Sequence, residues 1–337
     1  MDLRIELNGS TIFGLLHASI VTSNCFSADS FALTFVMGPP PMGDIMFWSS
    51  LSSAYVEIHA AAAYEPVSER LISGMIDAVQ VNPTQGTVAI EGRDLSSTMI
   101  DAYRQQDFVN QTASEVVSII AQYHGLAPVV SATSGNVGRY FGDGYTRLSL
   151  GQFSRLRSDW DVVVQLAREN MFDVFVQGTT LYFQPSVASS SVPVHLALRD
   201  LKLINFQRSL NITSSTTARV QSWNSQSVAS YDSGSPPSSG AGAPASSGTT
   251  AQPFLFSASN LTSQQVTNTA ERYSRELSRL GTVLHAEMPW NLALSARTII
   301  FLDETASAFD TLYQIESIER HYNTTSGSTQ IIRAVVV

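Results

Sequence analysis

Cysteine is almost absent from this chain of 337 residues, in which Cys25 stands alone. A single cysteine excludes an intrachain disulfide and any zinc site built on several cysteines. The N-terminus, MDLRIELNGS, carries acidic residues where a secretory signal peptide needs a basic and then an apolar stretch. No segment reaches the roughly 18 apolar residues of a membrane helix. We therefore expect synthesis in the cytoplasm, a reducing compartment that suits a disulfide-free chain, and no membrane insertion.

Charge is also scarce. Only 14% of the residues are charged, against about 25% in ordinary globular proteins. A weakly charged surface rich in Ser, Thr and Ala is typical of a protein covered by copies of itself or by partners, although hydroxyl-rich loops on a soluble protein are the alternative. The net charge is −9, and no basic run interleaves with aromatics, which argues against nucleic-acid binding. An acidic channel wall past which DNA slides stays open, as does a simple role in solubility.

The length predicts two or three domains. Residues 1–95 read as short strands of alternating polarity with turns between them, such as Asn8-Gly9 and the segment 82–86. This pattern predicts a first antiparallel β-barrel or sandwich domain. The expected strands are Leu3–Leu7, Phe31–Phe35, Tyr55–His59, Leu71–Val81 and Thr87–Glu91.

Residues 96–190 change character and predict an α/β domain. Thr112 and Glu115 form a capping box, in which the hydroxyl and the carboxylate each satisfy an amide of the first helical turn, and Ser158 with Asp161 repeats it. The first helix places apolar residues at helical spacing and stops at Gly125. A hairpin after the second helix turns at residues 177–179. The apolar residues expected on one helix face are Val116, Ile119, Ile120 and Tyr123.

Residues 191–337 return to strands and predict a second β-barrel domain. Ser233–Pro253 has no charge and little apolar surface, so we expect a flexible loop. A Thr262-x-x-Gln265 capping box starts a surface helix over 263–280, whose charged residues favour internal ion pairs. The expected strands are Val192–Leu198, Leu201–Asn211, Ala218–Trp223, Arg297–Leu302, Leu312–Ile318 and Gln330–Val336.

No motif carries catalytic or ligand chemistry. The glycine-rich segments 135–138 and 141–144 lack the Lys-Ser/Thr and the helix start of a phosphate-binding loop, which favours a turn. The six histidines show no metal-ligand spacing. We expect His124 to interact with a helix C-terminus and His321 to be structural. We predict no metal site and no cofactor.

Paired carboxylates are the one feature compatible with an enzyme. Asp101 with Asp107, or Asp303 with Glu304, are the residue types that glycoside hydrolysis requires. We favour the interpretation that these pairs are surface carboxylates near turns. No Gly-x-Ser-x-Gly elbow supports a serine hydrolase, and Trp160, at a capped helix start, reads as a core residue rather than a sugar platform. We predict no catalytic residue and no enzymatic activity.

An ordered set of segments resembles the late control D group of phage tail baseplate hub proteins, which is related to the N-terminal part of type VI secretion spike proteins. The resemblance covers most of the chain, and no single segment is specific alone. The matching segments are Glu91–Leu95, Met99–Asp101, Thr112–Leu126, Ser158–Asp161, Leu166–Glu169, Thr180–Phe183 and Leu312–His321.

This resemblance implies two small β-barrel domains bridged by an α/β domain, in a homotrimer whose six barrels form a pseudo-sixfold ring. Such a hub joins a sixfold tail tube to a threefold central spike and lets DNA pass without specific binding. The implied partners are further copies of the chain and the tail tube, central spike, baseplate wedge and tape measure proteins. The implied location is the virion tail baseplate, and the family analogy implies a contractile tail. The piercing tip is expected on a separate protein.

Three other functions stay open. A type VI-like secretion spike component shares the resemblance. A tail-associated enzyme that degrades cell walls would use the carboxylate pairs. A receptor- or carbohydrate-binding module would need aromatic residues clustered in loops, which the sequence has few of.

Overall fold

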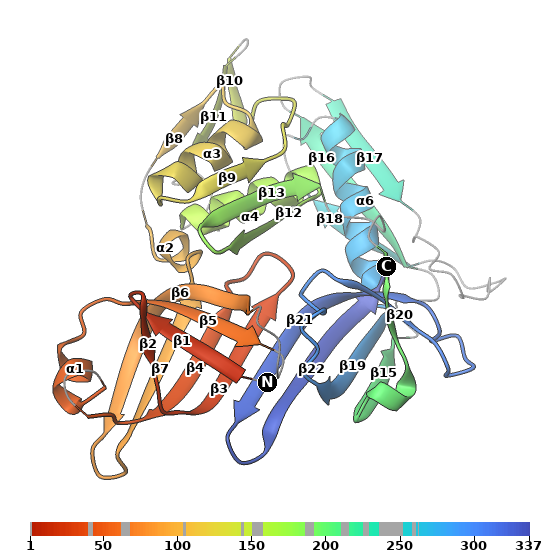
Figure 1. Ribbon diagram of the computed structural model, residues 1–337. Coiled ribbons are helices and arrows are strands. Elements are labelled where there is room, and N and C mark those ends of the chain that lie inside the picture. The colour runs from red at the N-terminus through yellow and green to blue at the C-terminus, as the bar shows by residue number, and fades with distance from the viewer. Residues whose placement is uncertain are drawn as a thin grey trace.

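The computed structural model is a mixed, mostly β structure dominated by one large sheet (Figure 1). Among the described residues, the large sheet has 13 strands and each of the other three sheets has 3. The predicted mixed, mostly β class is confirmed. The structure describes residues 2–39, 43–61, 68–103, 106–142, 145–149, 158–185, 192–209, 216–224, 229–235, 252–257, 261 and 263–337.

The N-terminal β unit, residues 2–94, contributes the first strands of the large sheet. Alternation turns Ile5, Leu7, Phe31, Leu33 and Phe35 into its core, where each is at most 3% exposed. The short helix α1 (Ile45–Ser50) adds the buried Trp48. The strands are β1 (Asp2–Leu7), β2 (Ser10–Ile12), β3 (Leu15–Ser23), β4 (Ser30–Val36), β5 (Tyr55–Ala61), β6 (Glu69–Asn82) and β7 (Thr87–Asp94).

The C-terminal β unit supplies the remaining strands of the large sheet. Its core includes Leu284, Ile300, Tyr313 and Ile332, all fully buried. A 3-10 turn, Leu198–Asp200, follows its first strand. The strands are β14 (Val194–Leu196), β15 (Leu203–Arg208), β19 (Thr282–Pro289), β20 (Ile299–Leu302), β21 (Leu312–Asn323) and β22 (Gly327–Val336).

The two β units are joined within one sheet. Strand β3 pairs antiparallel with β21, from Ser23 opposite Ser317 to His17 opposite Asn323. The strand order runs β15-β19-β22-β21-β3-β4-β7-β6-β5-β1-β2, with β20 paired to β21 and β14 paired to β20. Figure 1 shows this sheet across the lower half of the molecule. The sequence patterns give no sign of this pairing, because strands so far apart in the chain share no periodic signal.

The α/β unit, residues 97–185, lies above the large sheet in Figure 1 and contacts the turn between β3 and β4, where the Phe26 amide donates to the Val174 carbonyl at 3.2 Å. Both predicted capping boxes are present, at Thr112 and at Ser158, and Gly125 takes the predicted left-handed conformation after the first helix. Tyr123 departs from the prediction, since it is 66% exposed. The elements are α2 (Ser97–Ile100), β8 (Asp107–Val109), α3 (Ala113–Tyr123), β9 (Ala127–Val130), β10 (Arg139–Gly142), β11 (Tyr145–Ser149), α4 (Asp159–Asn170), β12 (Phe172–Gln177) and β13 (Thr180–Pro185).

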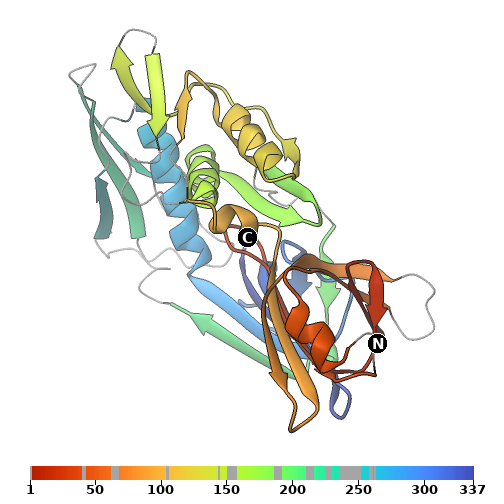
Figure 2. The ribbon, with the colours of Figure 1, turned by 90° about the vertical axis from the view of Figure 1, so that its left-hand side faces the viewer.

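A further sheet and helix lie beside the α/β unit, as Figures 1 and 2 both show. We call this segment the β16–α6 unit. Strand β16 (Thr216–Asn224) pairs with β17 (Ala229–Ser235) and with β18 (Gln252–Ser257) rather than with the large sheet. Helix α6 (Ser263–Arg279) packs on β16 and β17 through Val266 and Ala270.

One prediction for this unit needs correction. The sequence predicts a flexible loop over 233–253. The two ends of this segment, residues 233–235 and 252–253, are instead strand residues of β17 and β18, because they pair with β16. Residues 236–251 lie outside the described residues, as does Thr262 of the predicted third capping box. The helix predicted over 263–280 is present as α6, which turns Val266 and Ala270 toward the sheet. It keeps one predicted ion pair, Arg272 to Glu276 at 3.8 Å. In the described part of the chain, no helix has the length and apolar character to cross a membrane.

Candidate functional site

Two of the four carboxylates considered for catalysis, Asp101 and Asp303, lie in ion pairs with basic side chains. Asp101 accepts a hydrogen bond from Arg93 at 2.8 Å and is 62% exposed, while Asp107 lies on β8. Asp303 lies 3.7 Å from the His195 ring nitrogen, with the Asp303 side chain 42% exposed. An exposed carboxylate neutralised by a neighbouring base lacks the enclosed environment that tunes an acid catalyst.

The two histidines considered in the sequence have different surroundings. His321 lies in β21, where its Nε2 atom is 3.0 Å from Glu319 and its ring packs edge-on against His17. His124 follows helix α3, and its Nε2 atom lies 2.8 Å from the fully buried Asp159 at the start of α4. His124 does lie at the C-terminus of α3, as predicted. The prediction lacked the second contact of its ring, which connects α3 to Asp159 at the start of α4.

Trp160 and the glycine-rich segments have structural roles. Trp160 is 5% exposed within the core of the α/β unit, as predicted, and its indole N–H points to the Phe26 carbonyl at 3.4 Å. Gly135 and Gly138 have positive φ angles, as turns require, but Arg139–Gly142 forms strand β10. Asp143 and Gly144 lie outside the described residues.

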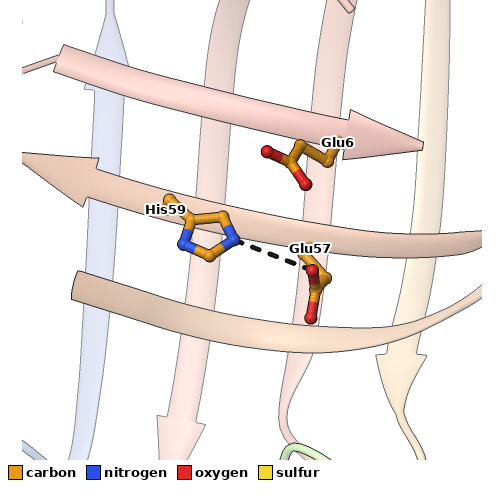
Figure 3. Close-up of side chains that lie close together, drawn as sticks. All are labelled: Glu6, Glu57 and His59. Atoms are coloured by element: carbon orange, nitrogen blue, oxygen red, sulfur yellow. Dashed lines mark ion pairs between the residues drawn. The ribbon is translucent and has the colours of Figure 1, made fainter. Parts of the chain in front are cut away.

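One cluster combines metal-ligand residue types. Glu6 of β1 lies directly across from Glu57 of β5, and His59 lies two residues further along β5 (Figure 3). Their ligand atoms all lie within 4.8 Å of one another. Sequence reasoning missed this cluster because Glu6 is far from the other two along the chain; only the Glu57-x-His59 spacing gave a local sign.

Arginines neutralise this cluster. Arg4 lies 2.7 Å from Glu6, and Arg70 lies 3.4 Å from Glu57. In the sheet, Arg4 and Arg70 flank His59 in the row beside the two glutamates. Like charges directly across a strand pair are destabilising unless opposite charges lie beside them. The arrangement therefore reads as an ion-pair network on a sheet face, in which the glutamates already have cationic partners.

A cleft lies where the two β units meet the α/β unit. Its lining comes from β6, from the β12–β13 turn at Gly178, and from the segment before β20. An added Cβ atom at Gly178 would lie 2.5 Å from the Arg70 guanidinium, so the turn approaches β6 closely. The principal charged lining residues are Asp29, Glu69, Arg70, Asp94, Arg297 and Arg320.

Buried charge concentrates around this cleft. Arg297 stacks on Phe175 with its guanidinium carbon 3.6 Å from the ring centre, and it donates to the Asn24 carbonyl at 2.5 Å. Burial lowers the pKa of the Arg297 guanidinium. Burial raises the pKa of Asp29 to about 6, and burial together with the Asp29 charge raises the pKa of Asp94 to about 7. Both pKa values lie closer to neutral pH than the pKa of an ordinary aspartate.

The raised pKa values predict a pH dependence of stability. Between about pH 4 and pH 7 the folded chain holds protons on Asp29 and Asp94 that the unfolded chain has lost, so their contribution to the free energy of unfolding falls as pH rises across that window. In Asp94→Asn, which keeps an acceptor for Ser96, urea unfolding between about pH 5 and pH 8 should show a shallower decline, with a difference on the order of a few kcal/mol. Parallel slopes in the two proteins would contradict the assignment.

Comparison with known proteins gives a family and a fold. The family model described as the Alg8 N-terminal domain matches residues 50–288. The 43 kDa tail protein of prophage MuSo2 from Shewanella oneidensis is similar over 100% of this chain and 98% of its own, with a TM-score of 0.74 and 14% identity. A tail protein from Neisseria meningitidis MC58 is similar over 99% and 97%, with a TM-score of 0.73 and 13% identity.

Similarity extends to secretion machinery. The E. coli c3393 protein, a component of the type VI secretion system, is similar over 99% of this chain and 76% of its own, with a TM-score of 0.62 and 12% identity. No curated protein sequence matches the chain. At these identities the similarity shows the fold alone: the chain has the fold of phage tail proteins and of a type VI secretion component.

Proposed function

The chain belongs to the family described as the Alg8 N-terminal domain, and from its fold we propose that it is the structural baseplate hub of a phage tail. One observation carries this proposal: the similarity to the MuSo2 tail protein runs from end to end in both chains. A match of that extent includes both β units, the α/β unit and their connections, rather than one widespread domain. The segments that resemble late control D proteins support the same function.

In this proposal the two β units act as two barrel domains, and three chains close a ring with six of them. Closed rings arise when the same heterologous contact repeats around a symmetry axis. Two similar units per chain would give a threefold assembly a sixfold face. That face would suit a sixfold tail tube, and the threefold symmetry would suit a central spike. The pairing of β3 with β21 supports this by fixing one β unit rigidly beside the other.

The proposed role is mechanical and includes no catalysis, metal or cofactor. The partners are two further copies of the chain, the tail tube, spike, wedge and tape measure proteins, in a baseplate assembled in the host cytoplasm. DNA would pass through the ring without specific contacts, consistent with the net charge of −9. A spike component of a type VI-like secretion system is the second candidate, favoured by the similarity to the E. coli secretion protein.

The mass of the purified chain in solution, with negative-stain images of the same sample, tests this proposal. We expect a particle of three chains, about 110 kDa from the chain mass of 36.5 kDa, seen end-on as a ring with a central hole. A monomer that stays monomeric at high concentration, and also when mixed with candidate tube and spike proteins, would contradict the hub.

A further inference from the structure

Two buried polar groups in the cleft at the junction of the three units lack a hydrogen-bond partner among the described residues. They are the Ser73 hydroxyl, on β6, and the Nε–H group of Arg320, on β21. Ser73 is 3% exposed and Arg320 is 4% exposed. A buried donor without an acceptor costs about 1–3 kcal/mol. The two groups come from different β units, and they belong to residues that line the same cleft.

The carboxylates of the cleft do not supply that acceptor. Asp29 accepts from the Ser23 amide at 2.7 Å, and Asp94 accepts from the Ser96 amide at 3.1 Å. Arg320 uses its Nη2 atom on the Leu294 carbonyl, which leaves the Nε–H group for something else. The Ser73 hydroxyl and the Arg320 Nε–H group are thus the two donors of the cleft that no acceptor among the described residues reaches.

The free donors and the space select the kind of ligand. Three arginines, Arg70, Arg297 and Arg320, line the cleft together with the carboxylates Asp29, Glu69 and Asp94, and the cleft encloses about 80 Å³, room for several water-sized groups. A metal cation has no ligand set there, because among the described residues only the Glu6, Glu57 and His59 cluster brings three candidate ligands together. A tetrahedral oxyanion offers acceptors in several directions, which suits guanidinium and hydroxyl donors.

We propose that this junction cleft binds one small free oxyanion of the sulfate or phosphate class, held by Arg320, Ser73 and the neighbouring arginines. The bound anion would tie the two β units together through Ser73 of one and Arg320 of the other. The inference does not depend on the hub function. Since an anion adds negative charge beside Asp29 and Asp94, its binding should take up protons and be tighter at about pH 6 than at about pH 8.

Sulfate is the probe, because its charge is constant across this pH range. Titration calorimetry of the full chain with sodium sulfate, against sodium chloride at matched ionic strength, should show about one sulfate bound per chain, more tightly at the lower pH. Ser73→Ala should weaken binding roughly 5- to 10-fold, the loss expected for one hydrogen bond. Arg320→Gln should abolish binding. Arg199→Gln removes an exposed arginine outside the cleft and should leave binding unchanged.

Thermal unfolding at low millimolar sulfate provides the second readout. Sulfate stabilises many proteins by exclusion from their surfaces, so the decisive comparison is between variants. A midpoint shift that is larger in the original chain than in Ser73→Ala supports the site. Equal shifts in both, with no heat of binding, would mean an adventitious ion only and would overturn the proposal. If Arg320→Gln does not fold, Ser73→Ala decides alone, since it removes a single hydroxyl.

Discussion

Replacing Gly74 with alanine is expected to prevent the N-terminal β unit from folding. Strand β6 approaches β7 so closely here that a Cβ atom on Gly74 would lie 1.9 Å from the Arg93 carbonyl oxygen and 2.8 Å from Asp94 Cα. These atoms are backbone in a paired strand, so no rotamer change relieves the contact. The cost should exceed the roughly 1–3 kcal/mol of ordinary overpacking. We expect Gly74→Ala to accumulate as insoluble chain.

The same hairpin provides the control. Gly86 lies in the turn between β6 and β7 with a φ of +65°, and nothing lies within 4 Å of an added Cβ atom. Gly86→Ala should therefore cost only about 1–2 kcal/mol, from its left-handed backbone. Soluble yield and urea unfolding of both variants test this. If Gly74→Ala is as soluble and as stable as Gly86→Ala, the two strands can separate and the prediction fails.

Local features of the chain were predictable from sequence, and distant pairings were not. The capping boxes at Thr112 and Ser158 were predicted because a hydroxyl and an acidic residue three positions apart suffice to specify them. The β12–β13 hairpin was predicted from an equally local signal, the turn at residues 177–179. The register of β3 against β21 depends on which of many similar strands meet, which the alternation of polarity does not encode.

The cleft at the junction escaped sequence analysis for a related reason. Asp29, Ser73, Arg297 and Arg320 come from four separated segments, and each alone is an ordinary polar residue. Their burial, and hence the raised pKa of Asp29, exists only after three units have packed together.

Removing the Asp159 carboxylate is expected to destabilise the α/β unit strongly. Asp159 is fully buried at the start of α4, and its carboxylate contacts the His124 ring at 2.8 Å. In Asp159→Ala the buried ring nitrogen loses this acceptor, and the first turn of α4 loses a negative charge that favours its N-terminus. We expect a loss of roughly 3 kcal/mol or more in the free energy of unfolding, measured in urea.

Asp101→Ala is the matched control. Asp101 also pairs with a basic residue, Arg93, but it is 62% exposed, and Arg93 keeps Asp77 as a partner at 2.6 Å. An exposed pair of this kind contributes about 1 kcal/mol or less. Similar losses of unfolding free energy in the two variants would mean that burial does not strengthen the contact between Asp159 and His124. A double-mutant cycle with His124→Ala separates the pair itself from the packing that each side chain contributes, because only a direct interaction makes the two losses non-additive.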